Sequence, residues 1–141
     1  GFGRDTLNGG GDDDLLLGQQ AGDTLIGGFG RDTLNGGGND DRLAAGGGAD
    51  TLVGGAGDDT LIGGGFRDKF IFADNFGDDR ILDFETDLDT LAFRQNSSVS
   101  GMADLTFTDV ARGVLIEDGA GSSVLLVGVA AADLDRDNFI F

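Results

Sequence analysis

The feature that most constrains this chain is a nine-residue repeat that runs without gaps through residues 1–71. The best copies read GGFGRDTLN (27–35) and GGAGDDTLI (54–62), which gives the pattern GGxGxDxUx with U a large apolar residue. The repeated acid is present eight times, as Asp5, Asp14, Asp23, Asp32, Asp41, Asp50, Asp59 and Asp68. Two positions after these acids stand Leu7, Leu16, Leu25, Leu34, Leu43, Leu52, Leu61 and Phe70.

Each repeat predicts a turn followed by a very short strand. Adjacent glycines permit positive φ, so GGxGxD favours a tight turn, and the xUx triplet alternates like a strand. One repeat cannot bury its own leucine, so neighbouring repeats must stack. We expect two consecutive repeats to form one coil with a strand on each side. Stacked coils, about 4.8 Å apart, would then form two parallel sheets with the leucines between them.

Stacking would place like charges in line along the two edges of the coils. One edge would carry Asp5, Asp23, Asp41 and Asp59, and the other Asp14, Asp32, Asp50 and Asp68. Carboxylates about 5 Å apart repel by roughly 1 kcal/mol per pair in a water-like dielectric, and by several times more near a protein surface. We therefore expect the fold to need a cation between them.

The predicted cation is Ca²⁺, because two carboxylates and several turn carbonyls form a flexible all-oxygen shell, whereas Mg²⁺ demands tighter octahedral geometry. Pairing each Asp with its equivalent two repeats later predicts about six ions, at 5/23, 23/41, 41/59, 14/32, 32/50 and 50/68. Six ions would change the net charge from −17 to −5. Besides the eight aspartates, the predicted ligands are Gly10, Gly28, Gly30, Gly37, Gly46, Gly48, Gly55, Gly57 and Gly64.

Glycine divides the chain into two predicted domains. Residues 1–71 hold 22 of the 28 glycines and form the repeat domain, and residues 72–141 have ordinary strand patterning. The second half predicts strands at 79–84, 88–93, 104–109, 113–118 and 123–128, and a helical turn at 130–135. We interpret the last three strands as an antiparallel meander in a small sheet that caps the open end of the stack. The predicted fold class is therefore all-β.

Composition excludes several kinds of function. Without Cys or His there is no disulfide framework, no thiolate nucleophile and no serine-protease triad or usual zinc site. A net charge of −17 argues against nucleic acid and anionic membranes as partners. No apolar run approaches the roughly 20 residues that span a bilayer.

No enzyme is expected within these residues. The close acid pairs Asp78/Asp79 and Glu117/Asp118 are interpreted as a solvated acidic face rather than as a glycosidase pair, since no aromatic platform accompanies them. The first residue is Gly1 rather than Met, so we expect a C-terminal piece of a longer protein. Any catalytic domain would then lie upstream.

The repeats resemble the RTX (repeats-in-toxin) haemolysin-type calcium-binding repeat. The resemblance covers residues 1–71 and implies a parallel β-roll with Ca²⁺ in the turns. Residues 68–93 are similar to the segment that follows such repeats in serralysin-type proteases and alginate-epimerase repeat modules. That likeness implies Asp83, Asp87 and Asp89 as further calcium or turn ligands. The acidic and apolar terminus, 133–141, is similar to the C-terminal signal of type I secretion; the other interpretation is a last strand tucked into the sheet, and both could hold because the signal would be read before folding.

Several repeats depart from the consensus. Gln19, Gln20 and Ala21 replace glycine-rich turn positions in repeat 18–26, and Asp12, Asn39 and Phe66 stand where Gly is usual. Gln and Phe tolerate left-handed backbone less well than Asn and Asp. We therefore predict weaker sites at Asp5/Asp23 and Asp23/Asp41. Without calcium, a Gly-rich acidic chain should behave as a flexible linker.

The outer strand positions, among them Leu15, Leu17 and Ile26, are more apolar than a solvated sheet needs. They indicate either ordinary stacking of coils or association with a partner domain or another copy.

The resemblance implies a secreted, extracellular or cell-surface bacterial module that folds on calcium binding. Its implied partners are an upstream domain of the same chain and, transiently, the ABC exporter of type I secretion. The alternatives are a polysaccharide-binding module and a self-associating component of a surface layer, adhesin or filament.

Overall fold

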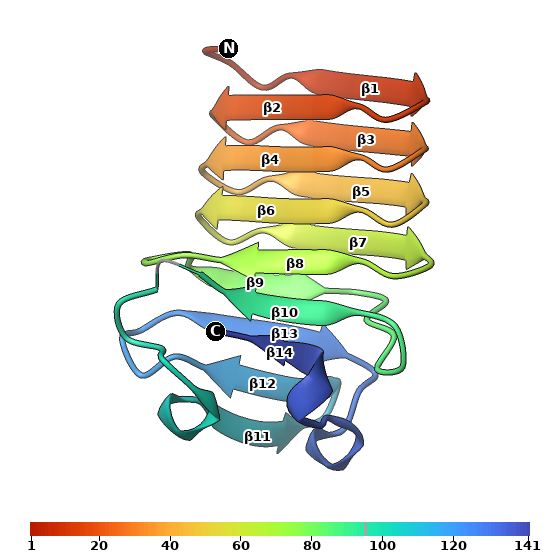
Figure 1. Cartoon of the computed structure of the whole chain (residues 1–141). Coiled ribbons are helices and arrows are strands. Elements are labelled where there is room, and N and C mark those ends of the chain that lie inside the picture. Colours follow the sequence, from red (N-terminus) through yellow and green to blue (C-terminus); the bar gives the residue numbers. More distant parts are fainter. Residues whose placement is uncertain (95) are drawn as a thin grey trace.

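The computed structural model describes residues 1–94 and 96–141, and its first half is a two-sided solenoid of stacked coils (Figure 1). Each repeat contributes one strand, and consecutive strands run on opposite sides of the coil. The strands of the repeats are β1 (Thr6–Gly11), β2 (Leu15–Gln20), β3 (Thr24–Phe29), β4 (Thr33–Gly38), β5 (Arg42–Gly47), β6 (Thr51–Ala56), β7 (Thr60–Gly65) and β8 (Lys69–Phe72).

The register between coils is two repeats, as predicted. β1, β3, β5 and β7 pair in parallel in one sheet, and β2, β4, β6 and β8 pair in parallel in the other. Leu25 lies opposite Leu7 and Leu43, and Leu34 lies opposite Leu16 and Leu52. The predicted parallel β-roll is thereby confirmed.

The repeat leucines form the core between the two sheets. Leu25, Leu34, Leu43, Leu52 and Leu61 are all fully buried. Leu7, in the first coil, is only partly buried, because no coil covers it from above. The outer positions are exposed as expected: Leu15 is 67% exposed and Leu17 45%.

Both sheets continue beyond the repeats. The added strands are β9 (Asp78–Ile81), β10 (Thr90–Phe93), β11 (Thr106–Val110), β12 (Gly113–Glu117), β13 (Ser123–Val127) and β14 (Phe139–Ile140). β9 pairs in parallel with β7, and β10 with β8, so the solenoid passes across residue 72. The division at 71/72 therefore marks a change of sequence pattern within continuous sheets, and two separate domains remain a prediction.

The predicted antiparallel meander is present as β11, β12 and β13. It does not form a separate sheet, however, because β13 pairs in parallel with β9 and so adds the meander to the edge of an existing sheet. The expected helical turn near 130–135 is the 3₁₀ helix η2 (Ala131–Asp133), and two more are η1 (Met102–Asp104) and η3 (Arg136–Asn138).

Phenylalanine closes the lower end of the solenoid. The ring centroid of Phe72 lies 4.9 Å from that of Phe76 and 5.4 Å from that of Phe93, and Phe139 and Phe141 extend the cluster. The chain terminus pairs with β10 as a last strand, and the type I secretion signal remains a prediction, since such a signal would be read before folding. No helix among the described residues is long and apolar enough to cross a membrane.

Replacing Leu43 by Ala should lower the free energy of unfolding of the calcium-loaded chain by about 2–5 kcal/mol. The substitution leaves a cavity between the two sheets, and the sheets cannot close around it because the neighbouring coils hold them apart. Urea denaturation measures this. Leu15→Ala is the matched control, since Leu15 is largely exposed. An equal loss in both variants would contradict the two-sheet core.

Candidate metal centre

The repeat aspartates stand in the turns, directly before the strands, and form two lines along the solenoid. We call the line of turns that holds Asp5, Asp23, Asp41 and Asp59 the Asp5 edge, and the line that holds Asp14, Asp32, Asp50 and Asp68 the Asp14 edge. Asp23, Asp32, Asp41, Asp50, Asp59 and Asp68 are at most 4% exposed. As predicted, each of these buried acids contacts the repeat Asp that stands 18 residues before it.

One oxygen of each of these carboxylates accepts a hydrogen bond from the backbone of the preceding coil. The N–H of Asp41, for example, donates to Oδ1 of Asp59 at 2.7 Å. The same bond joins Asp5 to Asp23, Asp14 to Asp32, Asp23 to Asp41, Asp32 to Asp50 and Asp50 to Asp68, at 2.6–2.9 Å. These bonds fix the orientation of the carboxylates.

The other carboxylate oxygen is buried and has no hydrogen-bond partner. This holds for Oδ2 of Asp14, Asp23, Asp32, Asp41, Asp50, Asp59 and Asp68. In the described part of the chain no Lys or Arg side chain pairs with a carboxylate; the one ion pair joins the N-terminal amine to Asp5 at 3.6 Å. A buried unpaired charge is very costly, so these oxygens need a cation or a proton.

A glycine five positions before the Asp leaves room beside most of the orphaned oxygens. A Cβ at Gly9, Gly18, Gly27, Gly36, Gly54 or Gly63 would collide with Oδ2 of the Asp that follows it. A Cβ at Gly18 would also meet the backbone carbonyl of Gly36, and one at Gly27 that of Ala45. These glycines were not among the predicted ligands, and Ala45 takes their place before Asp50.

The nine glycines predicted as ligands share one backbone property. All have φ between +98° and +139°. At the second glycine of a repeat this conformation also brings neighbouring coils into close contact. A Cβ at Gly28 would collide with the carbonyl of Gly10, and one at Gly46 with the carbonyl of Gly28. The carbonyls of these second glycines therefore lie at the interface between coils, whereas the carbonyls of Gly27, Gly36, Ala45 and Gly54 lie close to the orphaned carboxylate oxygens.

This donor set fits Ca²⁺. The described residues contain no group of three or more acidic side chains that would hold a metal by themselves. A shell must therefore combine the orphaned carboxylate oxygens with turn carbonyls. Such a set of neutral and charged oxygens without nitrogen or sulfur is the one that Ca²⁺ takes. When bound, the ion would neutralise the buried charges and tie successive coils together.

The carboxylate ladder extends past the last repeat. The N–H of Asp59 donates to Oδ1 of Asp79, and the N–H of Asp68 donates to Oδ1 of Asp89, both at 2.9 Å. Asp79 was not predicted as part of the site. The signal was present, since Asp79 and Asp89 each precede an apolar residue by two positions. The spacing along the ladder changes, however, from 18 to 20 and 21 residues.

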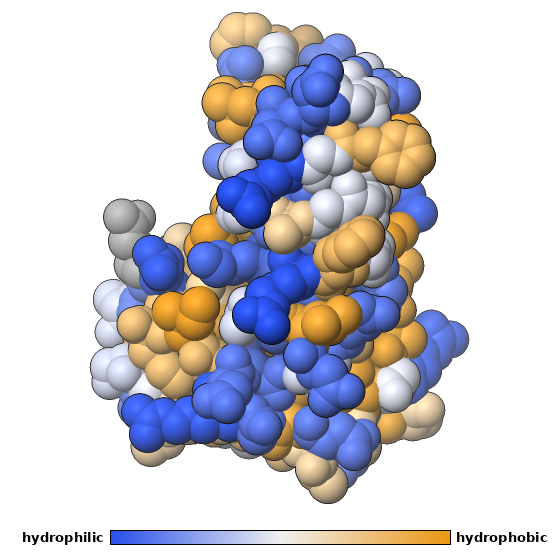
Figure 2. Space-filling view, turned by 45° about the vertical axis from the view of Figure 1, so that its right-hand side comes forward, coloured by the Kyte–Doolittle hydropathy of each residue, from blue (hydrophilic) through white to orange (hydrophobic). Residues whose placement is uncertain are grey.

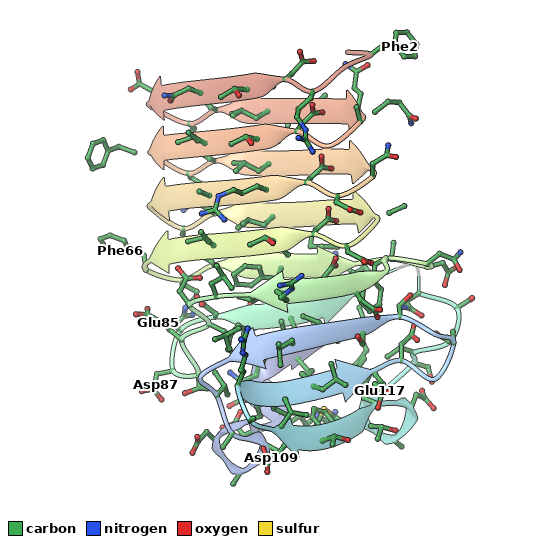
Figure 3. The ribbon with its side chains drawn as sticks, turned by 180° about the vertical axis from the view of Figure 1, so that it is seen from behind. Phe2, Phe66, Glu85, Asp87, Asp109 and Glu117 are labelled. Carbon is green, nitrogen blue, oxygen red and sulfur yellow. The ribbon has the colours of Figure 1, made fainter. Side chains whose placement is uncertain are left out.

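Other acids beyond residue 71 have different surroundings. Asp83 accepts hydrogen bonds from the backbone N–H groups of Gly63 and Gly64, both in β7, through its two oxygens, at 3.0 and 2.8 Å; a calcium or turn-ligand role for Asp83 remains a prediction. Both oxygens of Asp89 also accept backbone bonds, from Asp68 and Glu85. Asp87 is exposed at the same side of the molecule as Glu85 and Phe66 (Figure 3).

The interpretation of two acid pairs as a solvated face is wrong for one member of each. Asp79 is 2% exposed and Asp118 3%, whereas Asp78 and Glu117 are exposed. Asp79 belongs to the ladder. Asp118 accepts bonds from the backbone of Ala120 and Ser122 and shapes the turn between β12 and β13.

The substituted turns keep the backbone of the glycine turns. Gln19 and Ala21 both have φ of +81°, Phe66 has +83°, and Asp12 and Asn39 have +72°. Left-handed backbone costs a residue with a Cβ roughly 1–2 kcal/mol. The turn before Asp23 therefore forms at a cost in conformational free energy. Weaker calcium binding at Asp5/Asp23 and Asp23/Asp41 remains a prediction.

Burial raises the pKa of the innermost carboxyls. The pKa of Asp59 and of Asp68 is raised to about 7, and that of Asp79 to about 8. The main cause is desolvation; neighbouring carboxylates raise the pKa further, and the backbone hydrogen bonds lower it. Protons therefore compete with a cation near neutral pH.

Comparison with known proteins identifies the repeat. The sequence matches the RTX calcium-binding nonapeptide repeat in four copies, over residues 1–21, 17–52 and 35–70. No curated protein sequence matches the chain. Together with the structural likeness described next, the match shows that the chain belongs to the family of RTX calcium-binding repeat proteins.

Similar solved structures cover nearly the whole chain. The AlgE6R3 subunit of the Azotobacter vinelandii mannuronan C5-epimerase is 30% identical with a TM-score of 0.53, over 94% of this chain and 80% of that one. The AlgE6R2 subunit is 28% identical with a TM-score of 0.55, over 99% and 92%. The extracellular lipase LipA from Serratia marcescens is 30% identical with a TM-score of 0.58 over 92% of this chain, which spans only 20% of the lipase.

Asp59→Asn should raise the calcium concentration needed for half-maximal folding by at least about 10-fold, because even the loss of a group that only orients a metal ligand typically costs about 10- to 100-fold in affinity. The neighbouring Asp58→Asn removes the same charge from an exposed side chain and should change the midpoint little. Calcium titrations followed by far-UV circular dichroism compare the two. Equal shifts would show that only the overall charge matters.

Gln19→Gly/Ala21→Gly should lower the calcium midpoint, because it removes two strained left-handed side-chain residues before Asp23. Gln20→Gly, in the same turn, is the control because Gln20 does not have positive φ. A double variant that binds calcium no better than the parent would contradict the prediction of weak sites around Asp23.

Acid should favour the folded form of the metal-free chain. Between pH 3.8 and about 7 the folded state holds protons on Asp59 and Asp68 that the unfolded chain has lost, so its stability falls as the pH rises through this window. Circular dichroism of the metal-free chain should show more β structure at pH 5 than at pH 8. With calcium present, the midpoint should rise as the pH falls from 8 to 6. Equal β content of the metal-free chain at pH 5 and pH 8 would refute the protonation of these carboxyls.

Proposed function

We propose that the chain is a calcium-triggered folding module, in which binding of about six Ca²⁺ ions converts an acidic, glycine-rich chain into the solenoid. The observation that carries the proposal is the set of seven buried Oδ2 atoms without a partner. Ions between 5/23, 23/41 and 41/59 on one edge, and between 14/32, 32/50 and 50/68 on the other, would pair these oxygens. Binding free energy then becomes folding free energy.

The residues supply what such coupling requires. Asp59 and its equivalents hold Oδ1 in a backbone hydrogen bond, which leaves Oδ2 buried without a partner. The sites exist only when two coils lie in register, because the carboxylate belongs to one coil and its N–H donor to the preceding one. Folding and ion binding should therefore be cooperative along the stack.

A role in secretion follows from the same coupling. Extracellular calcium modules bind at about 10⁻⁴ to 10⁻³ M, far above the free calcium of a cytosol. The chain would stay unfolded inside the cell, which suits passage through a type I exporter, and would fold outside, where it would support an upstream domain. The RTX family membership and the likeness to an extracellular lipase support this proposal.

Polysaccharide binding is the second candidate. It is favoured by the likeness to two subunits of a mannuronan C5-epimerase, which covers most of both chains. The net charge of −17 and the absence of Trp and Tyr weigh against an acidic polymer as ligand. Calorimetric titration of the calcium-loaded chain with polymannuronate tests this candidate directly.

Circular dichroism with calcium and with excess EGTA tests the main proposal. We expect a β spectrum in calcium and an unfolded spectrum in EGTA at pH 8, because the buried carboxylate charges cannot remain unpaired. Magnesium at the same concentration should fail to replace calcium. Equal β content with and without calcium would refute the coupling.

A further inference from the structure

The two edges of the solenoid differ in charge. The residue directly before each repeat Asp lies at the surface of the turn, and it varies from coil to coil. Along the Asp5 edge this position holds Arg4, Gly22, Asp40, Asp58 and, before Asp79, Asp78. Along the Asp14 edge it holds Asp13, Arg31, Ala49 and Arg67.

The Asp5 edge carries a fixed row of negative charge. Asp40, Asp58 and Asp78 are exposed. The N–H of Asp58 donates to Oδ1 of Asp40 at 3.0 Å, and the N–H of Asp78 donates to Oδ1 of Asp58 at 3.1 Å. The carboxylates are therefore held one coil apart, at about 4.8 Å steps. Small residues, Gly38, Ala56 and Gly57, lie beside them in the same turns.

Along its repeats the Asp14 edge carries arginines and aromatic rings after a first turn that is acidic at Asp12 and Asp13. Beyond the last repeat, Arg67 lines one hollow together with Asp87, Asp135 and Asp137. Arg31 and Arg67 are exposed, and neither pairs with a carboxylate in the described part of the chain. Phe29 is 79% exposed and Phe66 is 70% exposed, the latter with a left-handed backbone. Between them the turn Gly46–Gly48 has no side chains. Figure 2 brings this edge forward and shows orange apolar groups separated by pale and blue surface, and Figure 3 labels Phe66 there.

The two edges match in register. A turn on one edge lies half a coil from the turns on the other, since successive strands alternate sides. Arg67, between β7 and β8, is therefore level with the interval between Asp58 and Asp78. Arg31 is level with the interval between Gly22 and Asp40. In the first coil the charges on the two edges are reversed, with Arg4 on the Asp5 edge and Asp13 on the Asp14 edge. Asp13 is level with the interval between Arg4 and Gly22.

We propose that the Asp14 edge of one molecule docks side by side on the Asp5 edge of a second copy, with the coils of the two molecules parallel and level. Sideways translation alone brings Arg67 between two aspartates, Arg31 beside Asp40 and Asp13 beside Arg4, and places no arginine against another. The exposed rings of the Asp14 edge then lie over turns whose side chains are small or polar. Two Asp5 edges could not pair, since their rows of aspartates would face each other.

This contact joins unlike surfaces, so it leaves one free edge of each kind and generates open rows rather than closed dimers. It rests on the proposed calcium-dependent folding, because the edges exist only in the stacked chain. Calcium should also promote it by reducing the net charge that keeps copies apart.

Sedimentation equilibrium of the calcium-loaded chain tests the proposal, with circular dichroism to confirm folding in each sample. The weight-average mass of the parent should rise with concentration to at least twice the monomer mass of 14.4 kDa. Arg31→Glu/Arg67→Glu should remain monomeric. Arg80→Glu/Arg112→Glu makes the same charge change at two exposed arginines that are not among the residues paired in the proposed contact, and it should associate like the parent.

A mixing experiment tests which surfaces meet. Asp58→Lys/Asp78→Lys should not associate alone but should form mixed assemblies with Arg31→Glu/Arg67→Glu, because each variant then presents an edge of opposite charge to the other. Should the lysine variant fail to fold, Asp58→Asn/Asp78→Asn keeps the hydrogen-bond acceptors and should weaken the association seen in the parent.

Two results would overturn the proposal. One is a folded parent that stays at 14.4 kDa, including a monomeric parent whose arginine edge instead binds polymannuronate. The other is an arginine variant that associates like its control. A chain that does not fold in calcium would instead contradict the proposed folding function, and circular dichroism of the same samples separates the two failures.

Discussion

The structure depends on a carboxylate shared between two coils. One oxygen of each buried repeat Asp holds the backbone N–H of the preceding coil, and the other is buried without a partner. The hydrogen bond of the first oxygen sets the register between coils. The unpaired second oxygen makes that register unfavourable unless a positive charge is supplied. The leucine core alone is thin, because each coil contributes only two large apolar side chains. Charge neutralisation therefore decides whether the apolar residues can be buried at all.

Much of this arrangement could be predicted from the sequence because the repeat is strict. A period of nine with Asp and Leu in fixed positions allows only one way to alternate sides, and it correctly predicts the parallel sheets, the buried leucines and the two lines of aspartates. The positive φ of the nine predicted glycines follows equally from the local pattern. Even the antiparallel meander could be recognised, since its strands are separated by ordinary turn residues.

The parts that could not be predicted are those where the period changes. Short insertions before Asp79 and Asp89 hide the continuation of the ladder, although the backbone absorbs them and both sheets go on. Gly9 and its equivalents leave room for the carboxylate of the Asp five positions later. The position of that carboxylate in space cannot be deduced from the spacing of residues in the repeat. The attachment of the meander to β9 likewise depends on the parallel pairing of Asp78–Ile81 with residues 123–126, which are far apart in the sequence.

The alternation of strands between two sheets also limits how such a chain can change in length. Loss or duplication of two repeats would leave every later strand in its own sheet. A change of one repeat would exchange the two sides for everything downstream, so that β9 would reach the wrong sheet and the aromatic end would meet a mismatched coil. Solenoids of this kind should therefore diverge in whole coils, and the parity of their repeat number should be inherited together with the end that closes them.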